Sequence, residues 1–211
     1  TARALQSNFE RMWTAVITGR RPQFVKPNFE RMFSILTSAP WPRQRFIRPV
    51  ILEYIHRATQ CIYITTPYFI PDLRLFQALR RAARRGVDVR VLIPATSDHK
   101  FVQRAAESYF SVCLRSGIRI IRYTKRFIHA KTFSIDDQWA SVGSCNFDSA
   151  GFLYTHETNI ASTQTEFVRT LREQFLADCR HSRAVSLAVW RRRPMSHKII
   201  ELLTWPFHRF F

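Results

Sequence analysis

The stretch that decides the fold is CIYITTPYFIPDLRLFQALRRAARRGVDVRVLI, which spans residues 61–93. It opens with the β-rich run Cys61–Thr66 and closes with a second such run, Val87–Ile93. Between the two runs, apolar residues recur at helical spacing opposite a row of arginines, and Gly86 supplies a helix stop. Two strands joined by a helix are typical of a parallel pair in an α/β sheet.

Helical and strand patterns alternate on both sides of this stretch. Upstream, apolar spacing predicts helices over 2–17 and 45–60. Downstream, the patterns predict a helix over 101–114, strands over 118–123, 128–135, 139–144 and 154–161, and a helix whose apolar face lies at 167–176. We therefore expect an α/β fold with a mostly parallel or mixed β-sheet flanked by helices on both faces.

The composition favours a phosphate-bearing partner. The 33 Lys and Arg against 15 Asp and Glu give a formal net charge of +18, which attracts nucleic acid, anionic lipid headgroups or phosphorylated substrates. Apolar residues are dispersed, and no run approaches the roughly 18 to 20 residues of a membrane-spanning helix. Four cysteines form no C-x-x-C pair, so we expect buried free thiols, a reducing compartment and no metal site: Cys61, Cys113, Cys145 and Cys179.

Four polar side chains are spaced to meet at the ends of two neighbouring predicted strands. His129 and Lys131 lie two apart in H-A-K-T-F-S-I-D, and Ser144 and Asn146 lie two apart in G-S-C-N. Side chains two apart on a strand share a face, so all four are expected to converge. Phosphodiester exchange needs a nucleophile, a proton donor and donors for the nonbridging oxygens. Imidazole, ammonium, hydroxyl and amide groups supply these roles, and the set requires no metal or other cofactor.

The pattern H-x-K-x4-D-x6-G-S-x-N resembles the HKD signature of the phospholipase D superfamily, and every defining position is filled. The resemblance implies a phospholipase D-like fold in which each active site joins two HKD motifs and a phosphohistidine intermediate forms. It implies that His129 is one of the two active-site histidines, as general acid and base or as nucleophile. It further implies that Lys131, Ser144 and Asn146 bind phosphate and that Glu157 orients a histidine. Asp136 matches the motif aspartate, with a structural and electrostatic part or a role as a turn cap.

Similarity to bacterial cardiolipin synthases extends beyond the motif, from Ile64-Thr-Thr-Pro-Tyr-Phe-Ile-Pro71 to about Cys179. This implies a phosphatidyltransferase that makes cardiolipin from two phosphatidylglycerol molecules and releases glycerol. The sequence departs from the synthase pattern after Asn146, because Asp148 is followed by Ser-Ala-Gly-Phe where relatives commonly show Arg-Ser-Phe, and because Thr155 replaces a frequent Asn. A phospholipase D-type lipid hydrolase, an HKD nuclease and a non-catalytic lipid-binding module remain the alternatives.

Four segments are expected along the chain. Residues 1–19 resemble the closing helix of a missing upstream HKD half, 20–44 form a linker and entry strand, 45–180 form the catalytic domain, and 181–211 form a basic, aromatic tail. The tail predicts contact with a membrane surface or packing on the domain. The expected partners are an anionic phospholipid substrate, a membrane surface on the cytoplasmic side, and a second HKD half, upstream or in a homodimer. Nucleic acid is disfavoured because basic and aromatic residues do not interleave along an obvious groove.

Overall fold

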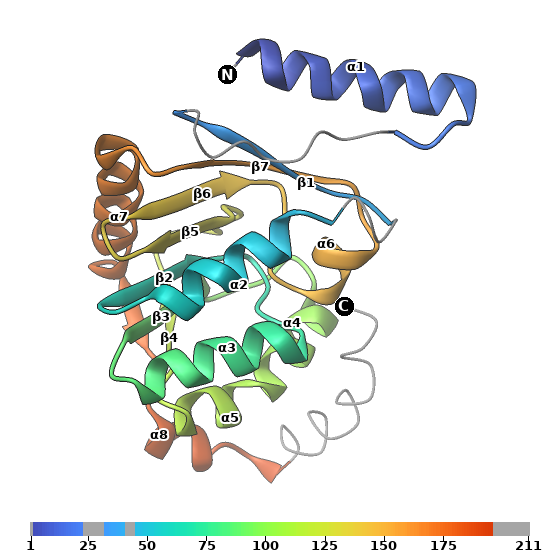
Figure 1. Ribbon diagram of the computed structural model, residues 1–211. Helices are drawn as coiled ribbons and strands as arrows, with labels where there is room; N and C mark the ends of the chain where they lie inside the picture. Colours follow the sequence, from blue (N-terminus) through green and yellow to red (C-terminus); the bar gives the residue numbers. More distant parts are fainter. Residues whose placement is uncertain (1, 23–31, 41–44, 196–211) are drawn as a thin grey trace.

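The computed structural model describes residues 2–22, 32–40 and 45–195, and in these residues eight strands form one sheet (Figure 1). In space the strands follow the order β1-β7-β6-β5-β2-β3-β4-β8. Their bounds are β1 Ser34–Ser38, β2 Cys61–Thr65, β3 Asp88–Pro94, β4 Arg119–Tyr123, β5 Thr132–Ile135, β6 Trp139–Gly143, β7 Glu157–Ser162 and β8 Ser182–Ala184. Strand β1 lies within the segment in which an entry strand was expected.

The sheet is mixed, with parallel pairing confined in the described residues to the block β2, β3 and β4. Helices cross between these strands, whereas the later connections are short or turn back at once, so β5, β6 and β7 pair antiparallel. Strands β1 and β8 also pair antiparallel, at the two ends of the strand order. The predicted α/β class is confirmed, and the mixed alternative describes the sheet better than a mostly parallel one.

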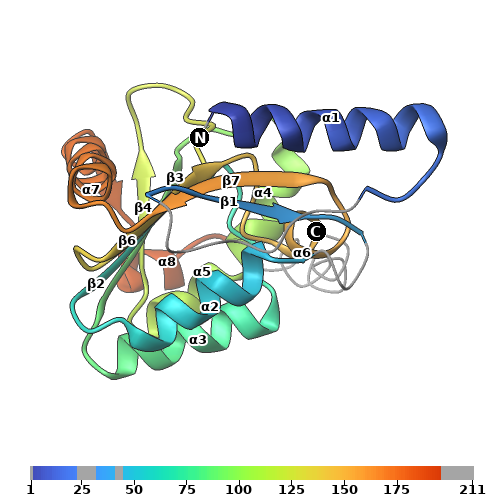
Figure 2. The same cartoon turned by 45° about the horizontal axis from the view of Figure 1, so that its top comes forward.

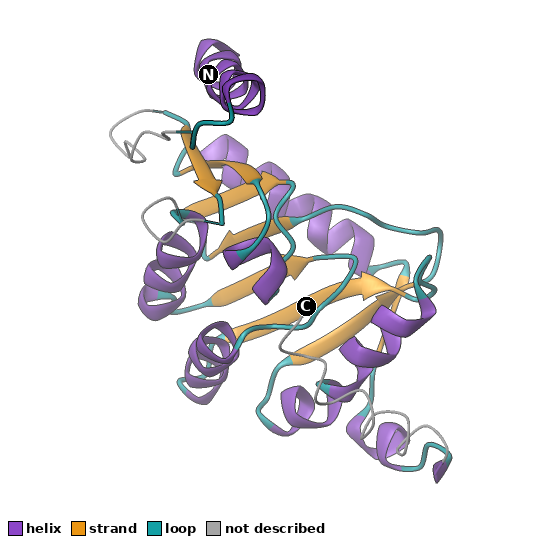
Figure 3. Ribbon diagram, turned by 90° about the vertical axis from the view of Figure 1, so that its right-hand side faces the viewer, coloured by secondary structure: helices purple, strands orange, loops and turns teal. Residues whose placement is uncertain are grey.

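Helices cover both faces of the sheet, as predicted (Figures 2 and 3). Helix α7 packs on one face, where Phe175 stacks on Tyr63 with ring centroids 4.6 Å apart. Helices α2, α3 and α5 pack on the other, over a core that includes Ile62 and Ile64 of β2. The helix bounds are α1 Ala2–Thr18, α2 Ile47–Arg57, α3 Leu73–Arg84, α4 Lys100–Ser108, α5 Phe110–Arg115, α6 Ser149–Leu153, α7 Thr165–Cys179 and α8 Leu187–Arg191.

Local signals explain where several of these helices begin and end. Asp72 caps α3 by accepting a hydrogen bond from the backbone N–H of Leu75 at 2.8 Å. Gly86 and Gly117 follow α3 and α5 with φ of 92° and 85°, a backbone region that glycine enters without strain. The single helix predicted over 101–114 is split, because the N–H of Tyr109 bonds to Ala106 three residues back and the chain turns before α5.

The two ends of the described chain differ in how they join the domain. Helix α1 lies outside the body of the sheet, has no buried residue, and contacts β7 through a 3.2 Å hydrogen bond from Asn8 Nδ2 to Thr158 Oγ1 (Figure 1). The start of the predicted tail instead forms β8 and α8, which pack on β4 and α5. Its apolar and aromatic end, 196–211, lies outside the described residues. None of the described helices is both long and apolar enough to cross a membrane.

Candidate active site

The sheet brings Lys131, Gly143 and Ser144 of the HKD motif together where the parallel strands end. Thr132 of β5 pairs with Thr65, the last residue of β2, and the N–H of Gly143 donates to the Lys131 carbonyl at 3.2 Å. One step further, the N–H of Ser144 donates to the Thr158 carbonyl at 3.1 Å. Lys131, Ser144 and the start of β7 therefore lie side by side. The carboxyl ends of strands in open α/β sheets are where ligands usually bind.

His129 lies in the loop before β5, because that strand begins at Thr132 and not near Ile128 as predicted. Its side chain is exposed, and its ring centroid lies 5.8 Å from that of Phe127. Lys131 holds the loop in place, since its Nζ donates to the His129 carbonyl at 3.1 Å. The Lys131 side chain thus contacts the backbone of His129, while the expected meeting of the two side chains stays a prediction.

Lys131 is the buried cation of the site, with 8% of its surface exposed. Burial lowers the pKa of its ammonium group, while the nearby carboxylates of Glu157 and Asp148 act in the opposite direction. A compact cation held among hydrogen-bonding groups is suited to the nonbridging oxygens of a phosphodiester.

Glu157 and Ser144 form a hydrogen-bonded pair at the beginning of β7. The Ser144 hydroxyl donates to one carboxylate oxygen of Glu157, and Thr155 Oγ1 donates to the other at 2.9 Å. Ser144 Oγ also accepts the backbone N–H of Thr158 at 3.1 Å. Thr155, at the position where synthases frequently have Asn, therefore supports the Glu157 carboxylate through its hydroxyl. The predicted contact between Glu157 and a histidine stays a prediction, because these hydrogen bonds run to Ser144 and Thr155.

Two glycines let the chain pass close behind Asn146. A Cβ atom on Gly143 would lie 2.3 Å from the Thr158 carbonyl oxygen, and one on Gly151 would lie 2.3 Å from the Asn146 carbonyl oxygen. Asn159 then fastens the turn, since its Oδ1 accepts the N–H of Cys145 at 3.2 Å. The Oδ1 atom of Asn146 is buried and has no hydrogen-bond partner in the described part of the chain.

Asp148 is a buried carboxyl that sequence reasoning did not assign to the site. It caps α6 by accepting the N–H of Gly151 at 2.7 Å. Burial raises the pKa of Asp148 to about 6. The negative charge of Glu157 also raises this pKa, while the positive charge of Lys131 lowers it. An Asp three residues before Gly151 is an N-cap signal that sequence reasoning could have used.

Asp136 is not brought to the other motif residues, because it follows β5 at the strand's far end. Its carboxylate accepts the N–H groups of Thr59, Gln60 and Cys61 at 2.9, 2.9 and 2.8 Å. Burial alone would raise the pKa of Asp136, but these hydrogen bonds outweigh it and the net pKa lies below the usual value. The geometry supports the structural alternative, in which Asp136 fixes the entry to β2.

The cysteines behave as small buried hydrophobes. Cys61, Cys113 and Cys145 are buried, Cys179 is half-buried, and all four thiols are free, which confirms the predicted free thiols. Burial raises the pKa of Cys113 to about 12. Within the described ranges no group of three or more His, Cys, Asp or Glu side chains is placed to hold a metal ion.

Comparison with known families and sequences gives a consistent match. Residues 51–179 match the family model described as the cardiolipin synthase, PLD-like domain. Cardiolipin synthase of Halalkalibacterium halodurans is 33% identical over 207 residues, which cover 94% of this chain and 41% of that protein. Cardiolipin synthase A of Pseudomonas putida is 37% identical over 151 residues, which cover 72% of this chain and 31% of that protein.

Solved structures show the same fold at lower sequence identity. Nuc, a phospholipase D family member from Salmonella typhimurium, superposes with a TM-score of 0.60 at 21% identity, covering 72% of this chain and 98% of Nuc. Phosphatidylserine synthase of Haemophilus influenzae superposes with a TM-score of 0.66 at 14% identity, covering 84% of this chain and 45% of that one. The chain spans about two fifths of the length of the Halalkalibacterium relative. By its fold, its complete HKD motif and its sequence relatives, the chain belongs to the phospholipase D superfamily, within the cardiolipin synthase PLD-like domain family.

Proposed function

We propose that this chain supplies one half-site of a phosphatidyltransferase that forms cardiolipin from two phosphatidylglycerol molecules and releases glycerol. The observation that carries the proposal is that Lys131, Ser144 and Glu157 lie at neighbouring strand ends beside the His129 loop, in a chain whose sequence relatives are cardiolipin synthases. The buried ammonium group of Lys131 and the hydroxyl of Ser144 are donors suited to the nonbridging oxygens of a phosphodiester.

The proposed reaction has two displacements at one phosphorus atom. In the first, a histidine nitrogen attacks the phosphorus of phosphatidylglycerol, and the departing glycerol oxygen takes a proton from a second, protonated histidine. In the next displacement, that now neutral histidine removes the proton from a hydroxyl of another phosphatidylglycerol, whose oxygen attacks the phosphohistidine. The P–N bond breaks and cardiolipin forms. We assign the acid and base role to His129, while Lys131 and Asn146 stabilise the charge on phosphorus.

The nucleophilic histidine in this scheme belongs to another HKD half, because His129 is assigned the acid and base role. Support for a partner comes from α1, whose large apolar side chains face solvent: Phe9, Trp13 and Val16 are 64%, 56% and 71% exposed. Such a row on a helix with no buried residue is suited to packing against a further domain. We propose that an upstream HKD half covers it, with a homodimer as the alternative. A complete gene product that has a single HKD motif and sediments as a monomer would contradict this.

We further propose that the protein acts at the cytoplasmic surface of a membrane, with an anionic phospholipid as its substrate. The net charge of +18 supports this, because each basic residue close to an anionic leaflet contributes about 1 kcal/mol of attraction.

The test is product analysis after the complete gene product is incubated with phosphatidylglycerol vesicles. Cardiolipin and glycerol are expected from the unaltered protein and should fall by at least about 10² to 10⁴ in rate in the His129→Ala variant. His56→Ala serves as the control, since His56 is an exposed residue of α2. Phosphatidic acid without cardiolipin would identify a hydrolase, and cleavage of nucleic acid with no lipid turnover would identify a nuclease.

A further inference from the structure

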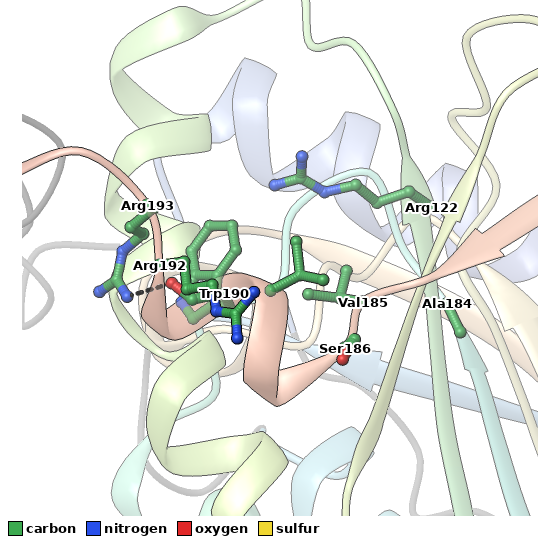
Figure 4. Close-up of a pocket in the computed structure, with 8 residues that line it drawn as sticks. Arg122, Ala184, Val185, Ser186, Trp190, Arg192 and Arg193 are labelled. Carbon is green, nitrogen blue, oxygen red and sulfur yellow. Dashed lines mark hydrogen bonds between the residues drawn. The ribbon is translucent and has the colours of Figure 1, made fainter.

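A cavity of about 500 Å³ lies between strand β4 and helix α8 (Figure 4). Arg122 of β4 stands on one side, and Arg192 and Arg193 stand on the other, at the end of α8. Trp190 and Val185 lie between them. A cavity of this size falls in the range that small ligands or the head of a larger one occupy.

The walls of this cavity combine positive charge with apolar surface, and no acidic residue lines it among the described residues. The guanidinium groups of Arg122 and Arg193 lie 5.5 and 4.8 Å from the centre of the Trp190 ring. Arg122 also binds Glu107 at 2.7 Å. That carboxylate is shared with Arg104 at 3.0 Å, so one negative charge stands against the two positive charges of Arg104 and Arg122. An anion is the complementary ligand.

Two polar atoms of residues that line the cavity lie beneath its surface. The Nε atom of Arg122 and the Nε1 atom of Trp190 are buried, and neither has a hydrogen-bond partner in the part of the chain that the structure describes.

The cavity is separate from the HKD site. Strands β2 and β3 lie between β4 and β5, which places the two strands about 14 Å apart at the usual strand spacing. None of the residues that line the cavity belongs to the HKD motif. A ligand here would therefore be held in addition to the reacting phosphodiester.

We propose that this cavity binds an anionic phospholipid at a site distinct from the HKD centre. Its phosphate is held by Arg122, Arg192 and Arg193, and the first part of an acyl chain lies against Val185 and Val189. The positive charge of the arginines that line the cavity favours an anion, and the apolar walls favour an amphiphile over a free phosphate or a polynucleotide. The choice of a phospholipid rests on the proposed function. The site would hold the α8 side of the domain against an anionic surface while the HKD site turns over.

A photoreactive phosphatidylglycerol can locate the site directly. The complete gene product is bound to phosphatidylcholine vesicles that contain a phosphatidylglycerol with a diazirine in its acyl chain, and the labelled peptides are mapped by mass spectrometry after irradiation. We expect label within residues 184–193. The double variant Arg192→Gln/Arg193→Gln should lower that label roughly tenfold, the factor for about one lost charge-assisted hydrogen bond. Arg180→Gln/Arg191→Gln removes the same charge from exposed residues that do not line the cavity, and should leave it unchanged.

A second variant keeps the test independent of the arginines. Val189 is 71% exposed, so Val189→Glu should fold normally while it places a carboxylate at the cavity, and the label should fall again. Equal labelling in the cavity and control variants, or label confined to 127–131, would overturn the proposal. Competition tests the choice of lipid. If inorganic phosphate or an oligoribonucleotide displaces the label at concentrations where excess unlabelled phosphatidylglycerol does not, the ligand is not a phospholipid.

Measuring cardiolipin formation beside the labelling distinguishes a failure of the proposed cavity site from a failure of the proposed HKD reaction. The His129→Ala variant should keep the label at 184–193 while it loses cardiolipin formation. Label at the cavity in a protein that forms no cardiolipin would contradict the proposed reaction alone, whereas cardiolipin formation without such label would contradict the cavity alone.

Discussion

The two ends of strand β5 carry parts of one motif, but their polar groups are satisfied to different degrees. At the end of the parallel strands, Lys131 is buried beside Glu157 and Asp148, and Asn146 keeps an unpaired oxygen. About 16 Å away at the strand rise of an extended chain, Asp136 accepts hydrogen bonds from the backbone of three consecutive residues. The polar groups at the Lys131 end can still bind a ligand, whereas the hydrogen bonds of Asp136 are used to hold the fold.

The largest effect is expected at the first end, from Lys131→Met. Loss of the buried cation should lower phosphatidyl transfer by about 10² to 10³, because one group that stabilises charge in the transition state contributes about 3 to 4 kcal/mol. The measurement is the rate of cardiolipin formation beside the midpoint of thermal unfolding. Lys125→Met, in the exposed part of the same loop, is the matched control. A variant that loses stability but keeps its rate would reverse the assigned roles of the two ends.

At the far end, Asp136→Asn should lower stability by about 2 kcal/mol and leave the rate per folded molecule unchanged, because an NH2 group replaces one of the two acceptor oxygens and faces backbone N–H. Asn tolerates the φ of 50° found here, so the backbone itself is not strained. The pKa of Asp136 is lowered in the folded state, so its contribution is present above about pH 4 and is lost as the pH falls through the folded pKa.

Urea unfolding at several pH values measures this effect. The gap between the unaltered protein and Asp136→Asn should close in acid, and Asp137→Asn, at the exposed neighbouring position, should show little gap at any pH. A gap that widens in acid would be inconsistent with the depressed pKa.

The smallest effect is expected from Asp148→Asn, which sharpens the contrast with Asp136 because the pKa shift has the opposite sign. Burial raises the pKa of Asp148 to about 6, so the ionised group costs stability above that pH. As the pH falls from about 6 to about 4, the folded protein binds a proton before the unfolded chain does, and stability rises. Asn keeps the helix cap, so the variant should be more stable at pH 7 by about 1 to 2 kcal/mol.

The check is the stability of the two proteins in urea between pH 4 and 7.5. The advantage of Asp148→Asn should shrink as the pH falls, and a constant difference over that range would show that Asp148 ionises normally. The rate of cardiolipin formation, measured alongside, reports whether the negative charge beside Lys131 is needed for transfer.

Local sequence patterns predicted much of this architecture because they report on local structure. The strand, helix and strand unit of 61–93 and the motif of His129, Lys131, Ser144 and Asn146 could be located from spacing alone. Periodicity carries no information about which distant strand a segment pairs with, so the order of the outer strands and the place of β8 were not predicted. The start of β5 was placed too early, because Ile128 continues the alternation although the ladder begins at Thr132.

The roles of supporting residues were harder to predict than those of the motif. Asn159 and Asp148 act through buried hydrogen bonds to the turn around Asn146, and such partners become visible only when β6, β7 and α6 are placed together. Glu157 was assigned from resemblance, and its observed hydrogen bonds depend on Thr155, a position where this chain departs from its relatives.

Strand β1 leaves the ribosome long before the strand with which it pairs. Ser34 lies opposite Ala161, so at about 5 to 20 residues per second the partner is synthesised roughly 6 to 25 s later. The block β2, β3 and β4 can assemble within that interval through short-range connections, while β1 waits with an unpaired edge. Translation speed and chaperone access during this interval should therefore influence how much newly made chain reaches the native state and how much aggregates.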